Sequence, residues 1–137
     1  MLETTQEDQI AALLRRARTI AIVGISEKRH RDSFQIAEYL LAQGYRVIPI
    51  NPKFTELLTQ PCYPDLQAVA EPIDIVNVFR RADAMPEVAA DAIAAKAGAL
   101  WMQLGLRHEQ AGETARAAGL DVVMDRCIKI EHRRLQG

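Results

Sequence analysis

The sequence predicts an α/β fold in which a doubly wound, mainly parallel sheet carries helices on both faces, in three layers. Apolar strand-like runs alternate along the chain with helical segments of about 10 to 12 residues, as right-handed βαβ crossovers require. Residues 19–23 form the clearest strand, because Ile20, Ile22 and Val23 favour β structure and no polar residue alternates with them. Gly24 follows directly. A first parallel strand ending in a glycine turn is a usual phosphate-binding place, although a glycine can also merely end a strand.

The N-terminal segment predicts an amphipathic helix over residues 6–17, capped by Thr5 and Asp8. We expect residues 1–18 to pack as a helix on residues 19–137, so that the chain forms a single domain overall. The apolar stripe of this helix consists of Ile10, Leu13, Leu14 and Ala17.

Further strands and helices follow in alternation. Ser33 should cap a second helix that Gly44 ends, and Gly98 should end a later one. A short strand is expected near Cys62, and the tail from Lys129 reads as polar and basic, without an element. The remaining expected strands are 45–50, 73–79, 99–102 and 120–124, and the remaining expected helices are 86–97 and 109–118.

Net charge and composition limit the classes of partner and site that this chain can have. The 137 residues carry a formal net charge of -1, which gives no general attraction for nucleic acid or for a membrane surface. No apolar run is long enough to span a bilayer, and we expect a cytoplasmic protein. Cys62 and Cys127 belong to no paired motif, so neither a zinc site nor a disulfide framework is indicated.

In a doubly wound sheet, ligands bind beyond the carboxyl ends of the strands. Most of the residues there are small, polar or cationic, and together they predict a rim suited to an anion with several polar groups. These strand ends are Gly24-Ile25-Ser26, Asn51-Pro52-Lys53, Phe79-Arg80-Arg81, Gln103-Leu104-Gly105 and Asp125-Arg126-Cys127.

Lys53 discriminates best between ligands. An NAD site places an acidic residue at the end of the second strand, to bind the ribose diol, whereas this chain has a lysine after Asn51-Pro52. A cation there favours a phosphorylated ribose, as in coenzyme A (CoA) with its 3′-phosphate or NADP with its 2′-phosphate. The alternative is a solvated loop lysine.

Basic and aromatic side chains near the first and third strands are further candidates. Phe79 could lie against adenine or a pantetheine arm, and Arg80 is the better placed of two adjacent arginines to meet a phosphate. Arg31 lies nearest the start of the second helix, where Ser33 can combine capping with a ligand contact. His30 reads as a surface residue.

The fourth and fifth strand ends complete the site. Gln103 and Gly105 suit a close approach by the ligand, while Trp101 fits the core or a subunit contact. Cys127, with Arg126 and Lys129 nearby, is a thiol that could exchange with a thiol-bearing ligand; simple packing is the alternative. We find no paired carboxylates, nucleophile with a histidine, or metal-ligand cluster, so no catalytic residue is predicted.

Five motifs in order carry a family resemblance: IAIVGIS (20–26), VIPINPK (47–53), VNVFRR (76–81), WMQLG (101–105) and VMDRCIKIE (123–131). With them the chain resembles the small stand-alone CoA-binding domain proteins of bacteria and archaea, the YccU-like family. That family shares a Rossmann-like fold with the CoA-binding domain of succinyl-CoA synthetase.

The resemblance implies a CoA-binding protein with no assigned reaction. Residues 24–26 would meet the diphosphate, residues 51–53 the adenosine 3′-phosphate, and Phe79 with Arg80 would line the crevice. Gln103 and Gly105 would face the pantetheine arm. The chain departs from the family at Ile25, where alanine is frequent, and at Ile128, where proline is frequent.

Four functions therefore stay open at this point. The chain could bind CoA or acyl-CoA for carriage, sensing or regulation, or be a minimal NADP-using enzyme. It could also form a CoA mixed disulfide through Cys127, or act only through protein partners. A homodimer could form through the N-terminal helix and Trp101.

Overall fold

The computed structural model describes residues 5–136; residues 1–4 and 137, which belong to the two segments predicted above, lie outside the described residues. Its main sheet has five parallel strands in the order β2-β1-β5-β6-β7. These strands are β1 (Thr19–Val23), β2 (Arg46–Ile50), β5 (Ile75–Val78), β6 (Ala99–Met102) and β7 (Asp121–Val123).

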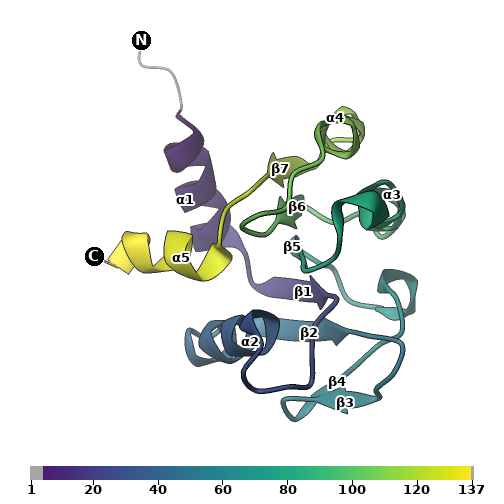
Figure 1. Ribbon diagram of the computed structural model, residues 1–137. Helices are drawn as coiled ribbons and strands as arrows, with labels where there is room; N and C mark the ends of the chain where they lie inside the picture. Colours follow the sequence, from purple (N-terminus) through teal and green to yellow (C-terminus); the bar gives the residue numbers. More distant parts are fainter. Residues whose placement is uncertain (1–4, 137) are drawn as a thin grey trace.

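Helices cover both faces of this sheet, which confirms the predicted three layers (Figure 1). One face carries α1 (Gln6–Arg16), α2 (Asp32–Ala42) and α5 (Ile128–Gln136); the other carries α3 (Met85–Ala94) and α4 (Glu109–Ala117). No helix in residues 5–136 is long and apolar enough to cross a membrane.

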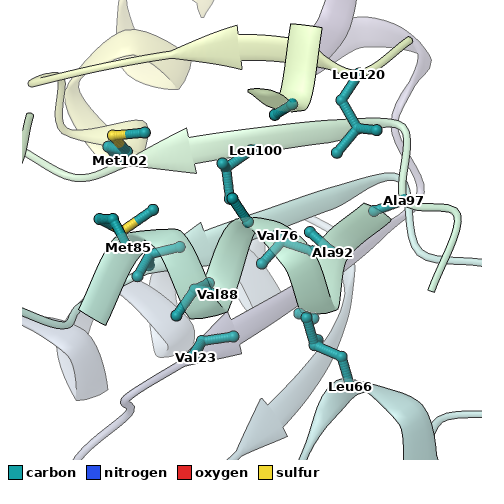
Figure 2. Close-up of a cluster of buried hydrophobic side chains, with 14 of the residues drawn as sticks. Val23, Leu66, Val76, Met85, Val88, Ala92, Ala97, Leu100, Met102 and Leu120 are labelled. Atoms are coloured by element: carbon teal, nitrogen blue, oxygen red, sulfur yellow. The ribbon is translucent and has the colours of Figure 1, made fainter. Parts of the chain in front are cut away.

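Successive side chains of each buried strand point to opposite faces of the sheet, so the hydrophobic core consists of two clusters, one on each face. In β1, Ala21 and Val23 face α3 and α4, whereas Ile20 and Ile22 face the other three helices. Figure 2 shows the first of these clusters, in which α3 residues such as Val88 pack against strand residues such as Leu100. The second cluster contains the fully buried Trp101 and the stripe of α1. Both features proposed for a dimer contact are therefore internal.

The cap predicted for α1 is confirmed. The Asp8 N–H donates to Thr5 Oγ1 (3.1 Å), and the Thr5 N–H donates to Asp8 Oδ2 (3.3 Å). Two amide donors at the helix start thus gain acceptors. The apolar stripe then buries Ile10, Leu13 and Leu14 against the sheet.

The largest difference from expectation is α5, which forms from a tail predicted to have no element. Glu131 is buried on this helix and pairs with Arg126 (3.2 Å) and Arg134 (2.9 Å). Arg126 in turn reaches Glu7 of α1 (3.1 Å). These ion pairs join segments far apart in sequence, so the local pattern could not reveal them.

Two predicted helix ends are also wrong. Ser33 lies inside α2 and does not cap it, because the extended residue Arg31 occupies the cap position and the Ser33 hydroxyl accepts from the Ser26 N–H. Helix α3 ends at Ala94, before Gly98, and Lys96 takes a left-handed φ of 57°.

The chain between β2 and β5 holds a small hairpin of β3 (Glu56–Leu57) and β4 (Gln60–Pro61). The short strand expected near Cys62 is present as β4, which ends directly before Cys62, and a single bridge joins Tyr63 to Ile50. Prolines at both ends of this stretch restrict further pairing, since proline has no N–H to donate.

His132 of α5 contacts two tyrosines on the same face of the sheet. Its Nδ1 lies 2.7 Å from the Tyr39 hydroxyl of α2, and the Tyr45 ring packs edge-on against its ring. Burial lowers the pKa of His132 from its ordinary 6.5. Near neutral pH this position therefore favours the uncharged imidazole.

This lowered pKa makes stability depend on pH. Below pH 6.5 the unfolded chain protonates His132 before the folded protein does, so stability should fall as the pH decreases through this window. Urea unfolding at about pH 7.5 and about pH 5.5 measures the effect, and His132→Asn should show a smaller drop between the two. An equal drop in both proteins would contradict this account.

Candidate functional site

The strand order creates a crevice at the carboxyl edge of the sheet. Because β1 lies between β2 and β5, the chain winds from β1 to one side and later returns to the other. Loops on opposite faces therefore separate beyond the ends of β1 and β5, and such a reversal is where open α/β sheets bind ligands. Most of the predicted site residues line the hollows there.

Gly24 is the most crowded position of the crevice. Its φ is +85°, and a β-carbon added there would lie 2.3 Å from the Phe79 carbonyl oxygen. The Gly24 N–H donates to the Ile50 carbonyl oxygen (3.2 Å), and the Phe79 N–H donates to that of Val23 (2.8 Å). A glycine is therefore needed to bring the ends of three strands together, whatever ligand binds.

The loop after Gly24 is held by its own hydroxyl groups. The Ser26 N–H donates to Ser33 Oγ (2.9 Å), and the Lys28 N–H donates to Ser26 Oγ (3.0 Å). Each hydroxyl can still donate its own O–H to a ligand oxygen. Ile25, where the family frequently has alanine, is only 1% exposed and packs in the core facing α1 and α2.

The first turn of α2 offers main-chain donors. The N–H groups of Asp32, Ser33 and Phe34 have no hydrogen-bond acceptor within residues 5–136. Free amides at a helix start carry partial positive charge and bind anions. Arg31, at the cap position, adds an exposed cation beside them.

Asn51 positions the loop that carries Lys53. Its Nδ2 donates to the Ile25 carbonyl oxygen (2.8 Å), and its Oδ1 accepts from the Lys53 N–H (2.9 Å). The Asn51 side chain is thus occupied in joining two loops. Pro52, next to it, is exposed and lines the hollow on the α3 side of Gly24.

These loops enclose a cavity of about 670 Å³, which we call the Gly24 cavity. No described carboxylate pairs with its cations Lys28, Arg31 and Lys53. His30 is exposed and also lines it. Glu27 and Asp32 are the acidic side chains of the lining. Three unpaired cations against two carboxylates favour an anionic ligand.

A second cavity of about 610 Å³, the Cys127 cavity, adjoins the first. Phe79 and Asp32 line both, so the two cavities adjoin at these residues, and we call them together the groove. Arg80 lines the Cys127 cavity and passes beside Gly24, since its Cδ would lie 3.0 Å from a β-carbon there. Arg81 pairs with the exposed Asp83 (3.2 Å), which leaves Arg80 as the free arginine of the two.

Gln103, Gly105 and Cys127 meet in the Cys127 cavity. The buried Gln103 Oε1 accepts from Asn77 Nδ2 (3.1 Å) and from the Ile128 N–H (3.3 Å). The Gly105 N–H donates to Asp125 Oδ1 (2.7 Å), so it is not free for a ligand. Cys127 is half-buried.

Of the two cations predicted near Cys127, the structure places Lys129 in the lining of the Cys127 cavity and Arg126 outside it. Arg126 instead pairs with Glu131 and Glu7. Arg133 also lines the cavity. Arg133 becomes part of the site only because α5 forms, which explains why the sequence did not indicate it.

Asn77 supports the site from inside the sheet. It is fully buried in β5, and its Oδ1 is the one buried side-chain oxygen within the described chain that has no hydrogen-bond partner. An amide inside an otherwise apolar strand is a signal that could have found this residue. Its bond to Gln103 joins β5 to β6 directly below the Cys127 cavity.

The hollow on the α3 side of Gly24 is more acidic. Lys53 and Arg80 line it together with Asp65, Glu87 and Asp91. Burial raises the pKa of Asp91, and the charges of Glu87 and Asp65 raise it further. This hollow is therefore less suited to a phosphate than the Gly24 cavity.

Residues 18–133 match a protein-family model described as a CoA binding domain. The chain belongs to the CoA-binding domain family. Uncharacterized protein YneT of Bacillus subtilis is 36% identical over 96% of this chain and 97% of its own. A hypothetical protein from Pyrococcus horikoshii OT3 has a solved structure with a TM-score of 0.92 at 36% identity, covering 100% of both chains.

The family also has enzyme relatives. The ADP-forming acetate–CoA ligase II of Archaeoglobus fulgidus is 26% identical over 76 residues, which are 54% of this chain and 11% of that enzyme. The comparisons confirm the family that the five motifs indicated, and the structure confirms its three-layer fold.

Proposed function

We propose that this protein binds CoA, free or as an acyl thioester, along the groove formed by the Gly24 and Cys127 cavities. Membership of the CoA-binding domain family supports the ligand. The observation that carries the proposal is the asymmetry of the groove. The Gly24 cavity offers unpaired cations and free helix amides, whereas the Cys127 cavity has several apolar side chains in its wall. CoA has the same asymmetry, with phosphates at one end and an uncharged pantetheine arm at the other.

Each predicted contact then has a part of the ligand to meet. The diphosphate would lie at Gly24, Ile25 and Ser26, beside the start of α2 with Arg31 and Ser33. A phosphate there would gain the free amides as charge-assisted donors.

The adenosine 3′-phosphate would lie at Lys53, on the loop that Asn51 holds and Pro52 shapes. Phe79 and Arg80 would flank the middle of the ligand, at the junction of the two cavities.

The pantetheine arm would follow Gln103 and Gly105 and bring its sulfur toward Cys127. Such a protein would act as a carrier or a sensor of CoA, or would regulate a partner protein according to the CoA that it holds.

Calorimetric titration with CoA, dephospho-CoA, NADP and NAD tests the proposal. We expect CoA to bind at sub-millimolar concentration and dephospho-CoA, which lacks the 3′-phosphate, to bind roughly 10- to 100-fold more weakly. NAD should bind weakest, because Lys53 has no phosphorylated ribose to contact. Tighter binding of NADP than of CoA would favour the NADP alternative, and absence of CoA binding would overturn the proposal.

A second candidate function rests on the position of Cys127. Its half-buried thiol lines the cavity proposed for pantetheine. With a CoA disulfide, the Cys127 thiolate would attack one sulfur, form a Cys127–CoA disulfide and release the other thiol, which takes up the proton. The disulfide itself is the oxidant, so the exchange balances without a further reagent.

Intact mass after incubation with CoA disulfide measures this exchange. The wild type should gain one CoA, and dithiothreitol should remove it. Cys127→Ser should gain none, while Cys62→Ser should react like the wild type, because Cys62 is buried and its thiol donates to the Asn51 carbonyl oxygen. An adduct that persists in Cys127→Ser would contradict this function.

A further inference from the structure

Two exposed hydrophobic residues lie at the Cys127 cavity. Leu104 is 64% exposed and Ile130 is 45% exposed, and among residues 5–136 they are the only large apolar side chains that are exposed. Leu104 lies in the loop after β6, and Ile130 lies in the first turn of α5. Two distant segments thus bring the exposed apolar side chains of the described chain to the lining of a single cavity.

Part of the wall of the same cavity is apolar, beside its charged residues. Ile36, Val78 and Leu106 line it together with the ring of Phe79. The adjoining Gly24 cavity has no such lining beyond Ile25, Phe54 and Phe79. Hydrophobic side chains exposed singly are ordinary, but two that line one cavity together with an apolar stretch of its wall indicate a binding surface for an apolar group.

The cations of the Cys127 cavity are partly engaged elsewhere. Lys129 Nζ lies 5.5 Å from the centre of the Tyr39 ring, a cation–π distance. Arg81 pairs with Asp83. Arg80 lies at the Gly24 junction, where a phosphate of the ligand is proposed. Arg133 has neither an ion pair nor an aromatic partner within the described residues, so, apart from Arg80, it is the cation of this cavity least engaged by the protein itself.

We propose that the Cys127 cavity receives the acyl group of an acyl-CoA and that this group is an apolar chain of about four to eight carbons, covered by Leu104 and Ile130. This inference rests on the proposed CoA binding. Free CoA ends at its thiol and would leave both side chains in water. An alkyl chain that continues beyond the thioester would remove them from water together with its own methylenes.

The expected dependence on chain length follows from the hydrophobic effect. Complete burial of one methylene group strengthens binding roughly fourfold. Because Leu104 and Ile130 are partly exposed to solvent, we expect each methylene group to be about half buried. Each methylene should then strengthen binding about twofold. Hexanoyl-CoA, with four more methylene groups, should therefore bind about 16-fold more tightly than acetyl-CoA.

The test is a calorimetric series with CoA, acetyl-CoA, butyryl-CoA, hexanoyl-CoA and octanoyl-CoA, together with succinyl-CoA. Butyryl and succinyl groups have equal numbers of carbon atoms and differ in ending on a methyl or a carboxylate. We expect affinity to rise along the alkyl series and butyryl-CoA to bind more tightly than succinyl-CoA. A flat series, or tighter binding of succinyl-CoA, would overturn the inference and leave CoA binding itself intact.

Variants test whether Leu104 and Ile130 cause the dependence of affinity on acyl-chain length. Leu104→Ser combined with Ile130→Ser should remove most of the gain from chain length, which is read within each protein as the ratio of hexanoyl-CoA affinity to acetyl-CoA affinity. Ala90→Ser, exposed on α3 across the sheet, is the matched control and should keep the full gain. A double variant that keeps the gain would overturn the assignment, and a wild type that binds no CoA would overturn the proposed function as well.

Discussion

Gly24→Ala should be the most destabilising single substitution considered for this chain. Its left-handed φ of +85° would cost an alanine about 1–2 kcal/mol. Its β-carbon would also lie 2.3 Å from the Phe79 carbonyl oxygen, and relief of that overlap would cost about 1–3 kcal/mol more. We expect a loss of about 3 kcal/mol in the free energy of unfolding, measured by urea denaturation.

Gly44→Ala is the matched control for this prediction. Gly44 has a similar φ of +94°, but a β-carbon there would meet no atom within 4 Å. Gly44→Ala should therefore lower the free energy of unfolding only by the backbone strain, about 1–2 kcal/mol. Equal losses in the two variants would mean that the contact between Gly24 and the Phe79 backbone contributes nothing.

Lys53→Ala should cause the largest loss of ligand affinity. A charge-assisted hydrogen bond from lysine to the 3′-phosphate is worth about 1.5–3 kcal/mol, so CoA should bind roughly 10- to 100-fold more weakly. Dephospho-CoA should bind the variant and the wild type equally, because the group that Lys53 contacts is then missing. Titration of both ligands into both proteins gives the coupling free energy between the Lys53 side chain and the 3′-phosphate.

The control for Lys53→Ala is Lys96→Ala. Lys96 follows α3 and precedes β6, so it lies at the opposite, amino edge of the sheet, and it is also exposed. Its removal should leave CoA affinity within about twofold. A similar loss in both variants would indicate general attraction by positive charge and no specific contact at Lys53.

The sequence predicted the fold because the strands of this chain are nearly pure apolar runs. Runs such as residues 19–23 carry a local signal of double burial, and the glycine after them marks the strand end. The end of the third apolar run also predicted that Phe79 would lie beside the ligand crevice, whereas its position between two cavities is visible only in the structure.

What the sequence could not predict depends on distant contacts. Helix α5 is stabilised by Glu131 and Arg126, whose partners include Glu7 at the other end of the chain. Ile130 and Arg133 line the Cys127 cavity from this helix, and the local sequence pattern indicated neither of them as a site residue. The prediction for Ser33 was wrong because the local sequence does not distinguish two positions of a serine before an apolar stripe. The serine can occupy the cap position, or it can lie two residues inside the helix, as Ser33 does.

A structure of the protein crystallised with CoA tests the central claim most directly. The account predicts the 3′-phosphate within hydrogen-bond distance of Lys53 Nζ, the diphosphate at the start of α2, and the sulfur in the Cys127 cavity. Density for CoA outside the two cavities, or a bound CoA whose 3′-phosphate leaves Lys53 in solvent, would contradict it.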